Sequence, residues 1–200
     1  MSLSAQTIET LLEALSEQLA AADACPVDLV VCGGTAMNFL GFAARPTKDV
    51  DVVALLNLPG KGEPEFLMAK PLPAYVLKAS ALVAKDFGIS PDWLNDGPAD
   101  LLRWGLPEGA ESRLIERRFG ACLTVHFLAR PDLICLKLYA YADSQAPRHR
   151  QDLLALEPTH EELETAANWV RTHDDSDAFL IDIRGALATL GAPDVAARIG

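Results

Sequence analysis

The stretch that decides the fold runs from Val30 to Val53 and reads VVCGGTAMNFLGFAARPTKDVDVV. Its beginning belongs to a β-rich run over residues 28–32, which is typical of a buried strand. The glycine pair 33–34 then favours a tight turn, because glycine adopts backbone conformations that other residues avoid. A short helix is predicted over residues 35–42 and a second strand over residues 49–56. The stretch therefore predicts a strand–turn–helix–strand unit.

Two carboxylates, Asp49 and Asp51, mark the second strand. Residues i and i+2 of a strand point to the same face, about 6.6 Å apart, so the intervening Val50 faces the core. Unpaired carboxylates this close repel each other, and a divalent cation between them removes that cost. Mg²⁺ takes one or two carboxylates together with substrate phosphates. The pair is therefore predicted to hold Mg²⁺ or Mn²⁺; the alternative is a solvated strand face.

The glycine pair and the residue after it, Gly33, Gly34 and Thr35, form a candidate phosphate cradle. Glycines let the backbone approach a ligand closely, and the start of a helix carries partial positive charge. Thr35 is also a candidate N-cap of the helix. The stretch is neither a Walker A loop nor a G-x-G-x-x-G motif. An ordinary turn is the alternative, but a cradle followed by metal-binding carboxylates is what phosphoryl or nucleotidyl transfer needs.

This order of motifs resembles the nucleotidyltransferase superfamily, which includes DNA polymerase β, kanamycin nucleotidyltransferase and the minimal nucleotidyltransferases. The residues that match its motif are Gly33, Gly34, Asp49 and Asp51. The form Arg45-x-Thr47-x-Asp49-x-Asp51 is most similar to a bacterial branch that contains the AbiEii-type toxins of toxin–antitoxin systems.

A downstream segment extends the resemblance to about residues 28–156. The branch has a helix of the form Asp-Leu-x-x-x-Lys-Leu-x-Ala, which Asp132–Ala140 fits. Lys137 of this helix would reach a triphosphate; the alternative is a surface lysine with its stem on apolar neighbours. The third carboxylate of the family is replaced by His126. Two readings stay open for it: a general base, or a neutral, hydrogen-bonded residue in a site without full activity.

The resemblance implies an α+β fold: a nucleotidyltransferase-like small mixed sheet with packed helices over residues 1–130 and a helical C-terminal part over residues 131–200. It implies transfer of a nucleoside monophosphate from an NTP to an acceptor hydroxyl. The implied catalytic residues are Asp49, Asp51, His126 and Lys137, and the implied nucleotide-binding residues are Gly33, Gly34, Thr35, Arg45 and Thr47. The implied partners are the nucleotide, an antitoxin-like protein and a compact RNA acceptor.

Two other functions stay open. The first is a catalytically inactive nucleotidyltransferase-like domain that binds a nucleotide or a protein. The second is an Mg²⁺-dependent phosphohydrolase, which would release inorganic phosphate in place of pyrophosphate.

The composition of the chain limits the kinds of molecule that it can bind. With 200 residues, half of them hydrophobic and 22% charged, the chain is long and apolar enough for a core and is not intrinsically disordered. Its formal charge of −11 argues against coating DNA or an anionic membrane. The basic residues near the motifs suffice for one nucleotide: Arg45, Lys48, Lys137, Arg148 and Arg150.

The cysteines and the N-terminus predict a soluble, cytoplasmic protein. None of the four cysteines, Cys25, Cys32, Cys122 and Cys135, forms a C-x-x-C pair, so free thiols are expected and a zinc site is not. The first residues lack the basic and apolar regions of a signal peptide. No apolar run approaches the roughly 20 residues that span a bilayer.

The rest of the chain reads as helices around one hairpin. Further helices are expected over residues 4–22, 74–87, 98–104, 131–143, 148–156, 159–172 and 178–190. A hairpin is expected around Phe119-Gly120, and residues 57–73 read mostly as loop. Trp93 lies in a predicted loop and is expected to be a core residue.

Overall fold

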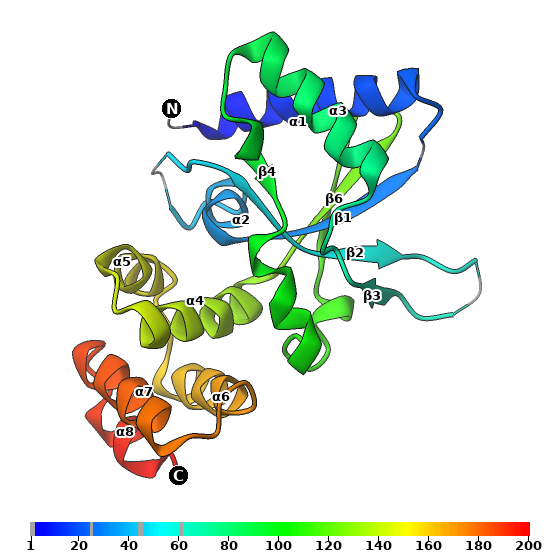
Figure 1. Cartoon of the computed structure of the whole chain (residues 1–200). Coiled ribbons are helices and arrows are strands. Elements are labelled where there is room, and N and C mark those ends of the chain that lie inside the picture. The colour runs from blue at the N-terminus through cyan, green and yellow to red at the C-terminus, as the bar shows by residue number, and fades with distance from the viewer. Residues whose placement is uncertain (1–2, 25, 44–45, 61) are drawn as a thin grey trace. The chain divides into compact units, whose positions relative to one another are not determined.

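The computed structural model describes residues 3–24, 26–43, 46–60 and 62–200 (Figure 1). The chain divides into two compact units. The N-terminal unit comprises Met1–Arg103 and Gly109–Leu128, and the C-terminal unit comprises Trp104–Glu108 and Ala129–Gly200. The first is built on a mixed sheet with packed helices and the second is helical, so the predicted α+β class is confirmed.

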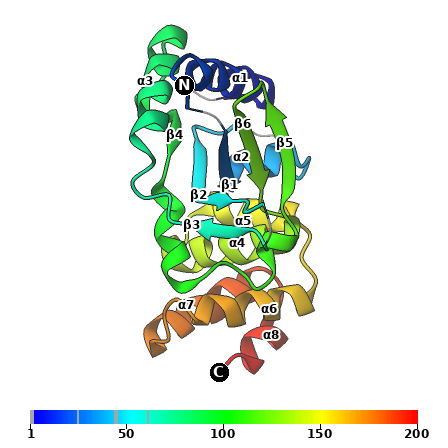
Figure 2. The same ribbon diagram turned by 90° about the vertical axis from the view of Figure 1, so that its right-hand side faces the viewer.

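The N-terminal unit contains a sheet whose strand order is β3-β2-β1-β6-β5. The sixth strand, β4, is not part of this order and pairs with the start of β2. Its strands are β1 (Val27–Cys32), β2 (Val50–Asn57), β3 (Glu65–Leu67), β4 (Leu94–Asn95), β5 (Ile115–Phe119) and β6 (Leu123–Phe127). Figure 2 shows β2, β1, β6 and β5 side by side in this order. The central strand β1 runs antiparallel to β2 and parallel to β6, which makes the sheet mixed.

One face of this sheet is covered by helices α1 (Ala5–Ala21) and α2 (Gly33–Phe39). The apolar stripe of α1 is fully buried because its residues recur at helical spacing: Ile8, Leu11, Leu12, Leu15 and Leu19. Phe39 of α2 stacks on Phe127 of β6 at a centroid distance of 5.0 Å. α1 also packs against α3 (Ala74–Phe87), whose bounds agree with the prediction.

A bulge in β2 decides which of its residues face away from these helices. Val30 of β1 pairs with Ala54, but the next residue, Val31, pairs with Val52, so Val53 is an extra residue in β2. Such an insertion shifts the side-chain alternation of the bulged strand by one position. Val52 therefore shares the helix-covered face with Val31, and Asp51, paired with Cys32, lies on the opposite face.

Several predicted elements differ in detail. Helix α2 begins at Gly33, with Cys32 as its N-cap, so Thr35 is not the N-cap. The segment predicted as loop contains the short strand β3, which pairs with the end of β2. Residues Gly97–Trp104 form a 3-10 helix. Trp93 is buried and its indole nitrogen donates to the carbonyl of Ser80, so the core prediction is confirmed.

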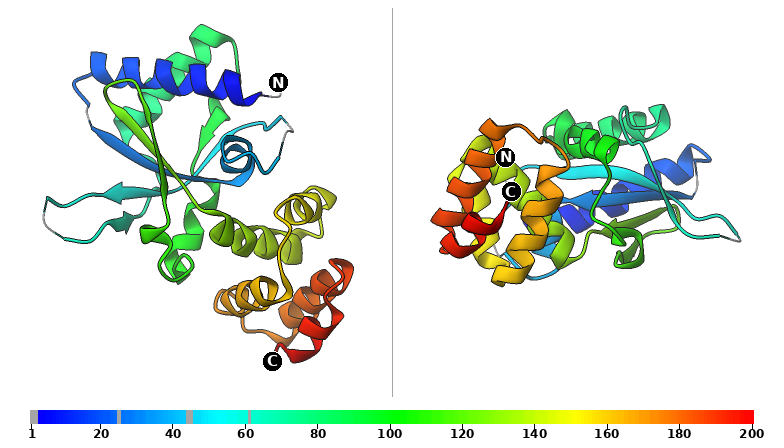
Figure 3. Two further views of the ribbon diagram at one scale, coloured as in Figure 1. Left: turned by 180° about the vertical axis from the view of Figure 1, so that it is seen from behind. Right: turned by 90° about the horizontal axis from the view of Figure 1, so that it is seen from below.

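The C-terminal unit consists of helices that follow one another closely (Figure 3). They are α4 (Arg130–Ser144), α5 (Pro147–Ala155), α6 (His160–Arg171), α7 (Asp177–Thr189) and α8 (Pro193–Arg198). The first four agree with the predicted helices, and α8 was not predicted. The capping box at Thr159 is confirmed, since its hydroxyl accepts from the amide of Glu162 while the Glu162 carboxylate accepts from the amide of Thr159.

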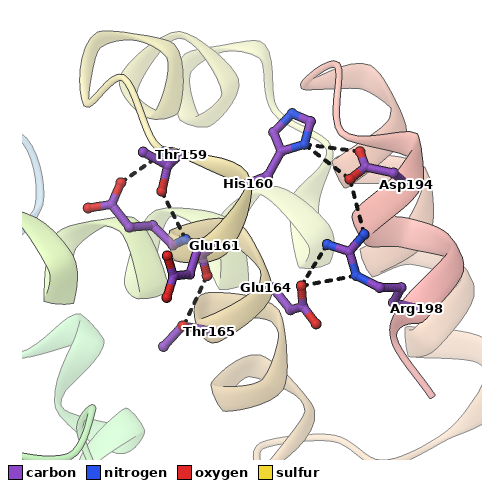
Figure 4. Close-up of polar contacts among 8 residues, drawn as sticks. Thr159, His160, Glu161, Glu164, Thr165, Asp194 and Arg198 are labelled. Atoms are coloured by element: carbon purple, nitrogen blue, oxygen red, sulfur yellow. Dashed lines mark hydrogen bonds and ion pairs between the residues drawn. The ribbon is translucent and has the colours of Figure 1, made fainter.

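A polar network on the surface joins α8 to α6 (Figure 4). The guanidinium of Arg198 donates to Glu164 over 2.7 Å and to Asp194 over 3.1 Å, and His160 lies 3.1 Å from Asp194. Burial raises the pKa of Asp194, but hydrogen bonds from Arg198 and His160 outweigh it and hold that pKa below its usual value. Exposed ion pairs of this kind contribute little stability each, so they fix the position of a short helix more than they hold the unit together.

The cysteines correct one expectation. Cys32 and Cys135 are free thiols, but Cys122 is disulfide-bonded, so the prediction of four free thiols is wrong. Cys25 lies outside the described residues. Cys122 sits in the turn between β5 and β6, where its carbonyl accepts from the amide of Val27, so the fold brings this turn beside the start of β1. Spacing along the chain does not reveal that proximity.

In the described part of the chain, no helix is long and apolar enough to cross a membrane.

Candidate functional site

Asp49 and Asp51 lie at the start of β2, with Asp49 directly before the strand and Asp51 as its second residue. Both side chains are partly exposed, whereas Val50 and Val52 are fully buried. The alternation follows from the period of a strand, and the bulge at Val53 keeps the carboxylates on the face away from α1 and α2. Two carboxylates are thus presented together at one end of the strand.

The turn at Gly33 lies against one of these carboxylates. Gly33 has a φ of +70°, which side chains rarely adopt, and it follows Cys32, the residue paired with Asp51. A Cβ built on Gly33 would overlap Oδ2 of Asp51 and lie 3.3 Å from its Cγ. A glycine is therefore needed here for two reasons, the backbone conformation and the space that the Asp51 carboxylate occupies.

Gly34 and Thr35 lie in the first turn of α2. The N-cap, Cys32, supplies no side-chain hydrogen bond to this turn. The first amides of a helix have no acceptor within the helix itself. These amides are the groups that the phosphate-cradle prediction requires.

Two buried threonines fix the main chain at Asp49. The hydroxyl of Thr35 donates to the carbonyl of Asp49 over 2.8 Å, and the hydroxyl of Thr47 donates to the same oxygen over 3.3 Å. Both residues are buried. These two hydrogen bonds fix the main chain directly before β2, and this is the structural role of the two threonines.

Asn95 belongs to this site, although the sequence reasoning missed it. It pairs with Asp51 across β4 and β2, and its amide nitrogen donates to Oδ1 of Asp51 over 3.2 Å. Its side-chain oxygen accepts from the amide of Gly97 over 2.9 Å, which orients the amide group. Asn95 therefore holds the Asp51 carboxylate from the side opposite β1.

Removing this support is expected to weaken metal binding. Asn95→Ala leaves Asp51 without its amide donor, and loss of a hydrogen bond to a metal ligand costs about 10-fold or more in metal affinity. Mn²⁺ binding, measured by titration calorimetry, reads out the change. Asn168→Ala, at an exposed position of α6, is the matched control. Equal Mn²⁺ affinity in the two variants would contradict a positioning role for Asn95.

His126 lies on β6, opposite Val30 of β1, and is buried. Its Nε2 is 2.8 Å from Oδ1 of Asp28. A hydrogen-bonded imidazole fits both of its predicted roles, because a carboxylate also orients a histidine that acts as a general base. Among the described residues, no three His, Cys, Asp or Glu side chains gather where they could hold a metal ion. His126 therefore does not complete a three-ligand group with Asp49 and Asp51.

Lys137 belongs to the C-terminal unit and is not a surface lysine. Its Nζ donates to Oδ2 of Asp152 over 2.6 Å, and the two side chains are only 8% and 2% exposed. The alternative of a lysine with a solvated ammonium is therefore wrong. The pair joins α4 to α5 within this unit.

The remaining basic candidates differ from one another. Arg45 lies outside the described residues. Lys48 is exposed. Arg150 donates to the carbonyl of Thr189 over 3.0 Å, and Arg148 donates to His149 over 3.2 Å. Of the residues predicted for the site, the structure brings together Gly33, Gly34, Thr35, Thr47, Asp49 and Asp51.

Comparison with solved structures gives a distant likeness. No known protein-family model matches the sequence, and no curated protein matches it. The chain is similar to the crystal structure of an antigenic nucleotidyltransferase-like protein from Paracoccidioides brasiliensis, with a TM-score of 0.49 and 15% sequence identity. The alignment covers 98% of this chain and 94% of that chain. A likeness this distant assigns neither a family nor an activity to the chain.

Proposed function

We propose that this chain is an Mg²⁺-dependent nucleotidyltransferase that moves a nucleoside monophosphate from an NTP to an acceptor hydroxyl. The observation that carries the proposal is the position of Gly33 against Asp51, beside Asp49 on the sheet face away from α1 and α2. This arrangement sets a glycine turn, the first turn of a helix and two carboxylates next to one another. Phosphoryl and nucleotidyl transfer depend on such a combination of phosphate positioning and charge.

The carboxylate pair fits the proposed metal. Both donors are oxygen ligands on partly exposed side chains, and Mg²⁺ is held by one or two carboxylates with water and phosphate oxygens around it. Asp49 and Asp51 would bind the ion, which supplies positive charge to the phosphate oxygens. Thr35, Thr47 and Asn95 would keep the two carboxylates in place through the hydrogen bonds described above. Gly33 and Gly34 would let the triphosphate approach the main chain.

The acceptor in this proposal is compact. The chain carries a charge of −11 and few basic residues near the motifs, which disfavours a long nucleic-acid footprint. A small RNA end, a protein side chain or a small molecule would provide the hydroxyl. The resemblance to the AbiEii-type branch favours a role in a toxin–antitoxin or defence system, with a protein antitoxin as partner.

A second candidate is a nucleotidyltransferase-like module without activity that binds a nucleotide or a protein. The observation that favours it is that, among the described residues, no third His, Cys, Asp or Glu side chain joins Asp49 and Asp51 in a metal-binding group, since His126 stands at the strand position of the family's third carboxylate. A site with only two carboxylates binds a metal–nucleotide complex without needing to activate the acceptor.

A melting experiment and a transfer experiment test both candidates. Mg²⁺ with an NTP is expected to raise the melting temperature by about 5–10 °C at a concentration of about 100 times Kd. Asp49→Asn combined with Asp51→Asn removes the shift, whereas Asp86→Asn, at an exposed position of α3, keeps it. The absence of a shift in the unaltered protein would contradict nucleotide binding.

The products formed from the NTP then distinguish the candidate functions. Label from an α-labelled NTP is expected on cellular RNA, protein or a small molecule, with release of pyrophosphate. A melting shift without label transfer would favour the inactive module. Release of inorganic phosphate in place of pyrophosphate would identify a phosphohydrolase.

A further inference from the structure

A pocket of about 490 Å³ lies in the N-terminal unit, away from the carboxylates of β2. Its lining comes from the start of β1, the end of β2, β3, the first turn of α3, and the hairpin of β5 and β6. Asp28 belongs to this lining, and it lies four residues before Cys32, the residue paired with Asp51. Four residues of strand span about 13 Å, so the pocket is a separate site. Its volume is within the range that small-molecule sites occupy.

One wall of the pocket carries charges of both signs in a defined order. Thr124 of β6 pairs with Arg118 of β5 on one side and with Asp28 of β1 on the other. Strands lie about 4.8 Å apart, so the Cα atoms of Arg118 and Asp28 are about 10 Å apart with the threonine between them. Glu116 precedes Arg118 by two residues on the same face of β5. A guanidinium and two carboxylates therefore surround one hydroxyl.

Two charged side chains of β5, Glu116 and Arg118, face the pocket. In the described part of the chain, the side chains of Glu116 and Arg118 form neither a hydrogen bond nor an ion pair. Arg117, which lies between them on the other face, pairs with Glu9 of α1, and its guanidinium is 5.0 Å from the ring centroid of Phe39. The side chain of Arg117 is thus used in contacts within the protein, whereas Glu116 and Arg118 are exposed at the pocket.

A second group of lining residues is apolar and exposed. Leu58, Leu67 and Tyr75 line the pocket and are 51%, 41% and 46% exposed. Large apolar side chains gathered around a pocket indicate a surface that is covered by a ligand in use. The ligand therefore has an apolar part of substantial size in addition to its polar end.

We propose that this pocket binds a free α-amino acid with a large apolar side chain. The ligand carboxylate would accept hydrogen bonds from the guanidinium of Arg118, and planar pairing of these groups is the strongest form of such a contact. The ligand ammonium would donate to Asp28, which His126 already orients, and to Glu116. The ligand side chain would cover Leu58, Leu67 and Tyr75. A zwitterion matches a wall with both signs of charge, which a purely cationic or anionic ligand does not.

Three probes that share a phenyl group test this assignment by calorimetry on the full chain. L-Phenylalanine has both charged groups, phenethylamine lacks the carboxylate and 3-phenylpropionate lacks the ammonium. L-Phenylalanine is expected to bind about 10-fold or more tightly than either analogue, because each analogue leaves one charged group of the pocket without its partner. Arg118→Gln is expected to weaken binding of L-phenylalanine by a similar factor, and so is Glu116→Gln.

Matched variants exclude a general charge effect. Lys78→Gln removes a positive charge and Glu13→Gln a negative one, both at exposed positions of helices outside the pocket, and both are expected to bind L-phenylalanine like the unaltered protein. Three results would each overturn the proposal: no binding of L-phenylalanine up to about 10 mM, equal binding of all three probes, or unchanged binding in both pocket variants. The test is independent of the nucleotidyltransferase proposal, because it involves neither a metal ion nor a nucleotide.

Discussion

Gly33→Ala is expected to lower Mg²⁺-dependent nucleotide binding about 100-fold, the effect of displacing an oriented metal ligand. The alanine Cβ would lie too close to Oδ2 of Asp51 and 3.3 Å from its Cγ, so the carboxylate has to rotate away. Rotation breaks the hydrogen bond from Asn95, so the carboxylate leaves the position in which that amide holds it. The loss is therefore expected in the affinity for the metal–nucleotide complex.

Gly41→Ala is the matched control for this variant. Gly41 has a φ of +78°, close to the +70° of Gly33, but a Cβ built on it would meet nothing within 4 Å. In both variants the alanine in a left-handed conformation lowers the free energy of unfolding by about 1–2 kcal/mol. Urea unfolding is therefore expected to give similar stabilities for the two. Only Gly33→Ala should lose nucleotide binding in calorimetry. Equal loss in both variants would assign the effect to the backbone, and no loss in either would remove Asp51 from the site.

The part of this site that lies close together in sequence could be predicted from the sequence. The alternation of Asp49, Val50 and Asp51 gives the face of each side chain, because a strand has a period of two. The glycine pair marks the turn, because a positive φ at Gly33 is rare for other residues. These are local rules of the backbone, and they apply before any tertiary contact is known.

The supporting residues could not be predicted in the same way, because their contacts join distant parts of the chain. Asn95 reaches Asp51 across 44 positions through a two-residue strand that has no periodicity to detect. Thr35 was expected to cap α2, since its residue type favours caps. The helix begins two residues earlier, and the threonine hydroxyl instead donates to the carbonyl of Asp49, 14 positions away. Tertiary hydrogen bonds thus outweigh local preference at both positions.

In the helices, too, the sequence predicts the bounds of an element but not the surroundings of a buried charged residue. Periodicity gave the bounds of α3 and α4 closely, because a helix buries every third or fourth residue. It did not give the environment of Lys137, which lies within a run of consecutive buried residues, Asp132–Leu138. Asp152, whose carboxylate offsets the cost of burying the ammonium, is on the next helix.

Lys137→Met is expected to destabilise the C-terminal unit by about 3–5 kcal/mol, because removal of one partner from a buried ion pair leaves the other charge buried. The Asp152 side chain is 2% exposed, so water does not replace the lost ammonium. Methionine has nearly the volume of the lysine stem, and the effect is therefore electrostatic. Urea unfolding followed by tryptophan fluorescence measures it, with Trp169 as a reporter in the same unit.

Two comparison variants decide what such a loss means. Lys137→Met with Asp152→Leu removes both charges and is expected to recover most of the stability, since apolar replacement of a whole buried pair is often neutral. Arg198→Ala breaks only exposed pairs on α6 and α8 and is expected to cost less than about 1 kcal/mol. If Lys137→Met costs no more than Arg198→Ala, the pair with Asp152 is open in solution. A loss of about 3–5 kcal/mol in Lys137→Met instead means that the ammonium stays on Asp152, so that it is not free to bind a triphosphate.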